Sequence, residues 1–216
     1  VGLIEANAIV DFDAIDELPA TGGTITITST DGAIIDFQND ASANFAATGT
    51  ITLSANTEIG SLDNRIDLAD LAVVDATSAT SDIALAGLGL LSVQNVQTTV
   101  GAIDIVADNV LVGSLVAGET IDVNSGDGIN DLQDDLIADF AAGGLINLVA
   151  VNEIGGMALS QNFDTGGRLE IPSGALISAN TTNGSVVVGG NGELNFQDLI
   201  TSEAVDISTT GNLTIV

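Results

Sequence analysis

The chain has 216 residues and combines 30 acidic side chains with only two basic ones, which gives a formal net charge of −28. It contains no His, Cys or Lys, which excludes histidine- or thiol-based catalysis, Schiff-base chemistry and nitrogen–sulfur metal sites. Two arginines cannot follow a nucleic-acid backbone, so nucleic acid is excluded as a partner.

The high charge coexists with an apolar fraction of 45% and a mean hydropathy of +0.46. This apolar content argues against disorder and is sufficient for a buried core. The longest nearly apolar run, Ile83–Val93, is well below the roughly 18 residues that a transmembrane helix needs. We therefore expect a folded protein without membrane insertion.

Short segments in which apolar residues alternate with polar ones recur along the whole chain. This period of two is typical of strands with one buried face. The predicted strands are Ile25–Ile27, Ile51–Leu53, Ile66–Leu68, Ile83–Leu85, Ile103–Ile105, Ile121–Val123, Ile146–Leu148, Leu169–Ile171, Val186–Val188 and Val205–Ile207.

The spacing of these segments indicates the architecture. Their starts are about 20 residues apart, and Asp-Gly and Asn-Gly pairs do not fall regularly between them, as hairpins of a sandwich or barrel would require. The sequence therefore predicts an all-β fold, a parallel β-helix (β-solenoid) of about ten coils stacked roughly 4.8 Å apart. Only Leu132–Ala142 has a pattern that also allows a helical turn.

A long internal repeat divides the chain. We expect one solenoid over residues 1–216, made of a preamble (1–23) and two related units, 24–119 and 120–216. Phe45 and Phe140 mark equivalent positions in the two units and are expected to be core residues. An insertion around Gly156–Gly167 in the second unit is expected to form an outward loop.

The segments GTITITSTDG, GTITLSANTEIG and VGAIDIVADNVLVGSLVAGETIDVNS resemble filamentous-haemagglutinin-like exoproteins and related giant bacterial surface proteins. The resemblance covers essentially the whole chain. It implies that G-x-I-x-I-x units build a right-handed parallel β-helix shaft.

Acidic residues recur at related positions in the two units. Carboxylates of this kind can bind Ca²⁺, which prefers oxygen ligands, although Asp and Asn also serve in turns and helix caps. Calcium is thus a possible cofactor, and no other is expected. The candidate ligands are Asp31, Asp36, Asp40, Asp127, Asp131 and Asp135.

No catalytic residues are assigned. Arg65 and Arg168 precede equivalent strands and are expected to form ion pairs with neighbouring acids. The run Gly189–Leu194 departs from the calcium-binding nonapeptide at Leu194, where that motif has Asp, so we expect an ordinary coil turn.

We therefore expect a non-enzymatic structural shaft from a large secreted or cell-surface bacterial adhesin, of which this chain is a segment. Its expected partners are neighbouring repeats or other copies of itself end to end, with a cell-surface or glycan ligand also possible. One alternative is the subunit of a self-assembling extracellular filament. Another is a carbohydrate-active β-helix enzyme, for which two suitably spaced carboxylates would suffice.

Overall fold

The computed structural model describes residues 2–6, 10–11, 18–20, 23–36, 42–133, 137–156 and 168–215, and of residues 2–20 the backbone alone. The described part of the chain contains 23 strands and no helix. They are β1 Gly2–Ala6, β2 Val10–Asp11, β3 Leu18–Ala20, β4 Ile25–Ser29, β5 Ile34–Ile35, β6 Phe45–Ala47, β7 Thr50–Ala55, β8 Ile66–Leu68, β9 Ala72–Ser78, β10 Ile83–Thr98, β11 Ile103–Val112, β12 Leu115–Ala117, β13 Ile121–Ser125, β14 Gly128–Asp131, β15 Phe140–Ala142, β16 Leu145–Ala150, β17 Glu153–Ile154, β18 Leu169–Glu170, β19 Leu176–Thr181, β20 Val186–Gly190, β21 Leu194–Ile200, β22 Val205–Thr209 and β23 Leu213–Ile215.

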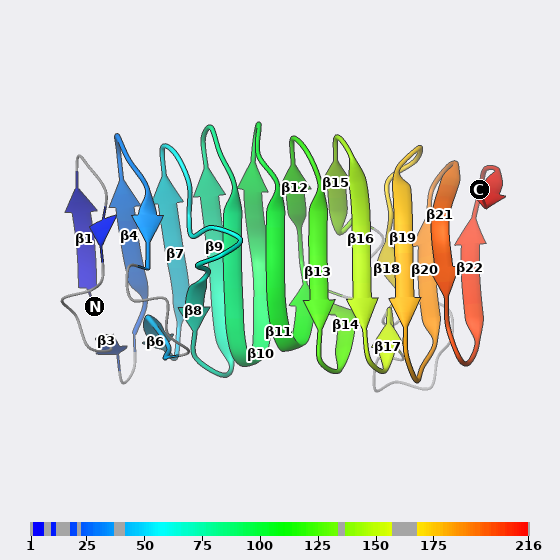
Figure 1. The fold of residues 1–216 in the computed structure, drawn as a ribbon, viewed down its shortest axis with the longest axis horizontal. Coiled ribbons are helices and arrows are strands. Elements are labelled where there is room, and N and C mark those ends of the chain that lie inside the picture. Colours follow the sequence, from blue (N-terminus) through cyan, green and yellow to red (C-terminus); the bar gives the residue numbers. More distant parts are fainter. Residues whose placement is uncertain are drawn as a thin grey trace.

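The strands pair in parallel and stack along one long axis (Figure 1), so the predicted all-β, solenoid-like parallel architecture is confirmed. Ten residues, one from each coil, pair with one another in a continuous row along the long axis, which we name row I. Its members are Val10, Ile34, Ile59, Ile83, Ile103, Ile121, Ile146, Ile177, Phe196 and Ile215.

The core follows directly from the alternation in the sequence. In β4 and β7 every second side chain is buried, and all seven isoleucines of row I between residues 34 and 177 are fully buried. Stacking identical β-branched side chains one coil apart favours the pleated backbone and removes apolar surface from water. Phe45 and Phe140 are fully buried too, as expected.

All ten predicted segments lie in strands except that β18 ends at Glu170, one residue short of Ile171. They do not form one row, however. Ile25 and Ile51 belong to a second row, named row II, which continues through Val74, Val93, Val112 and Asp131. Each coil carries strands on more than one side, and an inward apolar residue looks the same in sequence on every side.

Equivalent positions of the two units lie on different sides of the rod. Ile25 lies in row II, whereas its counterpart Ile121 lies in row I. After Ile25, the chain contributes four more residues to row II, one in each coil, before it reaches Ile121. The repeat therefore makes about four and a half coils, and the arrows of β4 and β7 point up in Figure 1 while those of their counterparts β13 and β16 point down.

The alternative of a helical turn over Leu132–Ala142 is wrong for the described residues, because β15 occupies Phe140–Ala142. There, Phe140 pairs with Leu115 of the preceding coil. The expected insertion loop lies almost wholly outside the described residues, since 157–167 are not among them. No helix among the described residues is long and apolar enough to cross a lipid bilayer.

Near the ends of the strands, hydroxyl side chains form hydrogen bonds that link one coil to the previous one. Ser125 is 1% exposed. Its Oγ lies 3.0 and 2.8 Å from the carbonyl oxygens of Asp108 and Gly128, and accepts a hydrogen bond from the Asp127 amide at 3.3 Å. Ser78 and Thr98 bond to carbonyl oxygens of turns in the same manner. These hydroxyls add hydrogen bonds to backbone carbonyl oxygens near the strand ends.

We predict that Ser125→Ala lowers the free energy of unfolding by about 1–3 kcal/mol, because the buried Gly128 carbonyl oxygen loses its donor. Urea denaturation followed by circular dichroism measures the change. The exposed Ser208 of β22 supplies the control. Ser208→Ala should stay within about 0.5 kcal/mol of the parent, and an equal loss in both variants would contradict the role of the buried hydroxyl.

One tight turn is strained in the first unit and relaxed in the second. The Ala72 amide bonds to the Ala69 carbonyl, and Leu71 between them has φ 65° and is 66% exposed. At the equivalent turn the third residue is Gly174, with φ 82°. Such turns favour glycine at this position because a side chain there costs about 1–2 kcal/mol.

Leu71→Gly is therefore expected to stabilise the protein by about 0.5–1 kcal/mol, the relief of strain being partly offset by the flexibility of glycine in the unfolded chain. The reciprocal change, Gly174→Leu, should destabilise it by a similar amount, because a Cβ atom there meets nothing within 4 Å and the cost is conformational. Thermal denaturation of both variants checks the pair. The two variants must change the melting temperature in opposite directions, Leu71→Gly upward and Gly174→Leu downward.

Candidate metal centre

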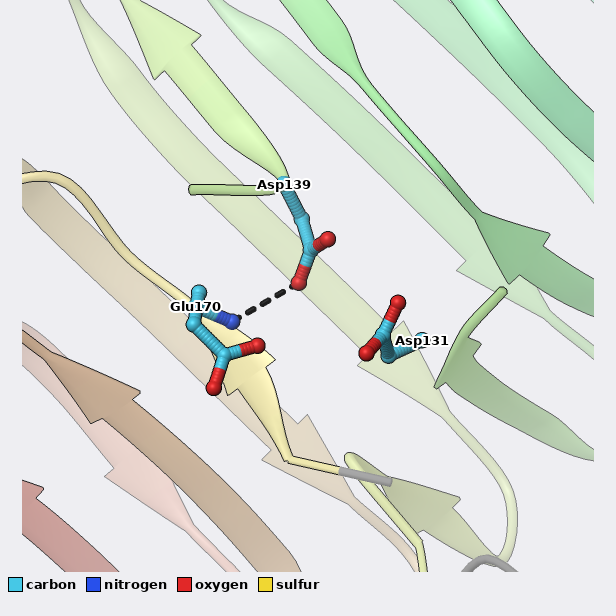
Figure 2. A group of neighbouring side chains, drawn as sticks. All are labelled: Asp131, Asp139 and Glu170. Atoms are coloured by element: carbon cyan, nitrogen blue, oxygen red, sulfur yellow. Dashed lines mark hydrogen bonds between the residues drawn. The ribbon is translucent and has the colours of Figure 1, made fainter. Parts of the chain in front are cut away.

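Three carboxylates that lie next to three different strands meet at one side of the second unit. Asp131 ends β14, Asp139 directly precedes β15, and Glu170 ends β18 (Figure 2). Each offers a carboxylate oxygen within 4.8 Å of the others. Asp139 is 2% exposed and Glu170 is 7% exposed, while Asp131 is partly exposed.

Backbone amides hold the carboxylates of Asp139 and Asp131 in place. The Glu170 amide donates a hydrogen bond to Asp139 Oδ2 at 2.7 Å (Figure 2), and the Asp139 amide donates to the Glu170 carbonyl at 2.9 Å. The Gln133 amide donates to Asp131 Oδ1 at 2.7 Å. The bonds between Asp139 and Glu170 thus join neighbouring coils, so the ladder sets the positions of these two residues.

The first unit contains the same arrangement with a lower charge. Asn44 occupies the position of Asp139, and Asp67 that of Glu170. The Asp67 amide donates to Asn44 Oδ1 at 2.7 Å, and the Asn44 amide donates to the Asp67 carbonyl at 2.8 Å. The backbone contacts are retained, but an amide replaces one carboxylate.

This difference bears on cation binding. Three converging carboxylates repel one another in a poorly solvated place, and a hard divalent cation such as Ca²⁺ relieves the repulsion by coordinating their oxygens. Asp131, Asp139 and Glu170 could hold such an ion. In the first unit, Asn44 contributes an uncharged oxygen and removes one negative charge.

Of the six calcium candidates from the sequence, only Asp131 lies in this cluster. Asp36 is buried at the corresponding place of the first unit, and its carbonyl accepts a hydrogen bond from the Asn64 side chain. Asp31 is exposed. The Asp127 carboxylate accepts hydrogen bonds from the amide side chains of Asn109 and Asn152. Asp40 and Asp135 lie outside the described residues.

Sequence reasoning missed Asp139 and Glu170. Glu170 stands at the middle of an apolar-x-apolar segment, a pattern that predicts an outward side chain, but both residues of β18 are buried. Asp139 adjoins the buried Phe140. The alignment of the two units could have drawn attention to Glu170, because it places an acid at the equivalent position of both units, Asp67 and Glu170.

Both arginines form ion pairs, as expected from their positions. Arg65 Nε bonds to Asp104 Oδ2, and Arg168 Nη2 lies 3.2 Å from Asp206 Oδ2. Each arginine spans two coils. Arg65 and Asp104 are separated by one coil. In that coil Ala84 pairs with Asp104 and is 1% exposed.

No protein-family model matches the chain, and neither a curated protein nor a solved structure matches it. The resemblance to filamentous-haemagglutinin-like exoproteins therefore stays a prediction that rests on the repeated strand pattern.

We predict that Ca²⁺ raises the melting temperature of the protein, and that Asp139→Asn abolishes the effect. A ligand at 100 times its Kd stabilises by about 2.7 kcal/mol, which corresponds to roughly 5–10 °C for a chain of this size. Without Ca²⁺, Asp139→Asn should melt at a higher temperature than the parent, because it removes one of three repelling charges. Differential scanning calorimetry with and without Ca²⁺ measures both effects.

The first unit provides the matched variant. Asn44→Asp recreates the three-acid arrangement there and should lower the melting temperature without Ca²⁺ and enlarge the shift with it. Absence of any shift in millimolar Ca²⁺ for the parent chain would rule out a specific calcium site at Asp131, Asp139 and Glu170.

Proposed function

We propose that this chain is a structural shaft: a right-handed β-helical spacer of a large secreted or cell-surface bacterial protein. The observation that carries the proposal is row I, an unbroken series of ten laterally paired residues from Val10 to Ile215. The row is fully buried from Ile34 to Phe196, so the coils between these residues share one core and form one stacked body and not a set of separate modules.

Such a stack separates its two ends in proportion to the number of coils. Neighbouring strands lie about 4.8 Å apart, so ten coils span roughly 48 Å along the axis. Bending requires ladder hydrogen bonds on one side to lengthen, and each coil is held by backbone bonds and by buried aliphatic side chains together. The mechanism is mechanical: the spacer transmits position and force.

The composition supports a role in extension and solvation. The charged side chains are almost all acidic, and mutual repulsion keeps such surfaces apart and soluble. Both arginines are used in ion pairs within the rod.

The proposal predicts that length increases with repeat number. Inserting a second copy of residues 24–119 between Glu119 and Thr120 adds about four and a half coils, so the maximum dimension should grow by about 22 Å. Small-angle X-ray scattering measures this length together with the radius of the cross-section, which should not change.

A lengthened protein with one cooperative transition and an unchanged cross-section supports the shaft. An insert that thickens the particle, or that behaves as a flexibly attached unit, would argue against it.

A further inference from the structure

We propose that one corner of the first unit binds an extended segment of a different protein, in which an apolar side chain lies between two arginines. This corner, named the leucine corner, consists of Leu71, Leu88 and Leu90. Leu71 and Leu88 are 66% and 45% exposed, and Leu90 is partly exposed. The Leu90 amide donates a hydrogen bond to Asp70 Oδ1 at 2.8 Å, so the leucines lie on neighbouring coils.

Two exposed aspartates flank the leucine corner along the axis of the rod. Asp70 lies in the coil before β10, and Asp108 lies in the coil after it, where Asn109 pairs with Leu90. The aspartates are thus two coils apart, a separation of about 10 Å. An apolar centre with an acid on each side is the result.

The second unit has the same corner with different side chains. The Glu193 amide donates to Ser173 Oγ at 3.0 Å, as the Leu90 amide does to Asp70 in the first unit. These positions are therefore equivalent, and serine replaces the first flanking aspartate. The three leucine positions are occupied there by Gly174, Asn191 and Glu193.

The second unit closes this corner with its own side chains. Thr210 Oγ1 donates a hydrogen bond to Asn191 Oδ1 at 2.9 Å, from one coil to the next. Their counterparts in the first unit are Asp108 and Leu88. Leucine has no polar group, so this bond cannot form in the first unit. The backbone therefore requires neither the leucines nor the flanking acids, and the first unit carries both.

The first unit also retains a leucine at a conformational cost. Leu71 has φ 65°, whereas Gly174 at the equivalent position has φ 82°. Strain of this kind persists where the surroundings enforce it and is concentrated at functional sites. Because Leu71 is exposed, the core of its own chain does not offset the strain. A partner that covers the leucine corner would offset it by removing apolar surface from water.

Charge determines which partner suits the leucine corner. The chain has two basic side chains, Arg65 and Arg168, and both bond to aspartates within the rod. A second copy therefore brings no free arginine, and two copies at −28 each repel one another. The partner must supply its own cations, and arginine binds carboxylates through two parallel hydrogen bonds.

The spacing indicates the pattern of the bound segment. In an extended chain, side chains two positions apart point to the same side and lie about 6.6 Å apart. An arginine two positions before a leucine and another two positions after it therefore face the same side as that leucine. Their long side chains can reach acids about 10 Å apart along the rod.

A titration with a synthetic peptide tests the proposal. The probe is acetylated Gly-Arg-Ser-Leu-Ser-Arg-Gly amide, and binding is followed by nuclear magnetic resonance of the labelled full chain. The amide signals of Asp70, Leu88 and Asp108 should shift and saturate. The control peptide Gly-Arg-Leu-Ser-Ser-Arg-Gly has the same composition but turns its leucine to the opposite side. It should bind about tenfold more weakly, because its leucine is not buried.

Two variants take their residues from the second unit, so the fold is expected to accept them. Leu71→Gly with Leu88→Asn and Leu90→Glu should bind the probe about tenfold more weakly, although it adds a negative charge. Asp70→Ser with Asp108→Thr should weaken binding at low salt and reduce its dependence on salt.

Equal binding of the probe to the parent and to the leucine variant would overturn the proposal, since it would show only general attraction to an acidic rod. Leucine-dependent dimers of the parent chain in sedimentation velocity would assign the corner to a second copy and would overturn it as well. Neither result affects the shaft, because the scattering experiment on the inserted repeat depends only on stacking within one chain.

Discussion

The parallel, in-register ladder is the constraint on which the rest of this structure depends. Most strand residues lie directly above a residue of the next coil, so a side chain there must suit its neighbours at about 4.8 Å on both sides. Inward positions meet this requirement with isoleucine on isoleucine. Outward positions meet it less easily in a chain with 30 acids. Asp104 stacks on Asp122, and Arg65 and Asn147 lie beside them to bond the two carboxylates.

The periodicity of the sequence was sufficient to predict the strands and the shared core, because alternation reports directly which face is buried. It could not tell on which side of the rod each strand lies. Ile25 and Ile121 each follow a threonine and begin an alternating segment, yet they belong to different rows. Their placement depends on how many residues the intervening turns consume, which no local pattern encodes. Glu170 was missed for a related reason, since its burial comes from neighbouring coils and not from its own strand.

The two units also show how the same backbone tolerates different chemistry. Asn44 and Asp139 accept the same backbone hydrogen bond at 2.7 Å, so the ladder does not discriminate between an amide and a carboxylate. The difference lies in the charge that each leaves beside the neighbouring acids. Leu71 and Gly174 make a similar contrast in conformation. One unit thereby serves as a control for the other, with the coil geometry held constant.

The half coil at the end of each repeat has a consequence for valency. Surface features that the units share, such as the Arg65–Asp104 and Arg168–Asp206 pairs, are carried to opposing sides of the rod. A partner that recognised one unit would find the next identical epitope facing away from it. In an array of such units, epitopes on the same side would recur only every second repeat, roughly 43 Å apart at nine coils. Such a rod would bridge two surfaces more readily than it would hold one surface by several contacts.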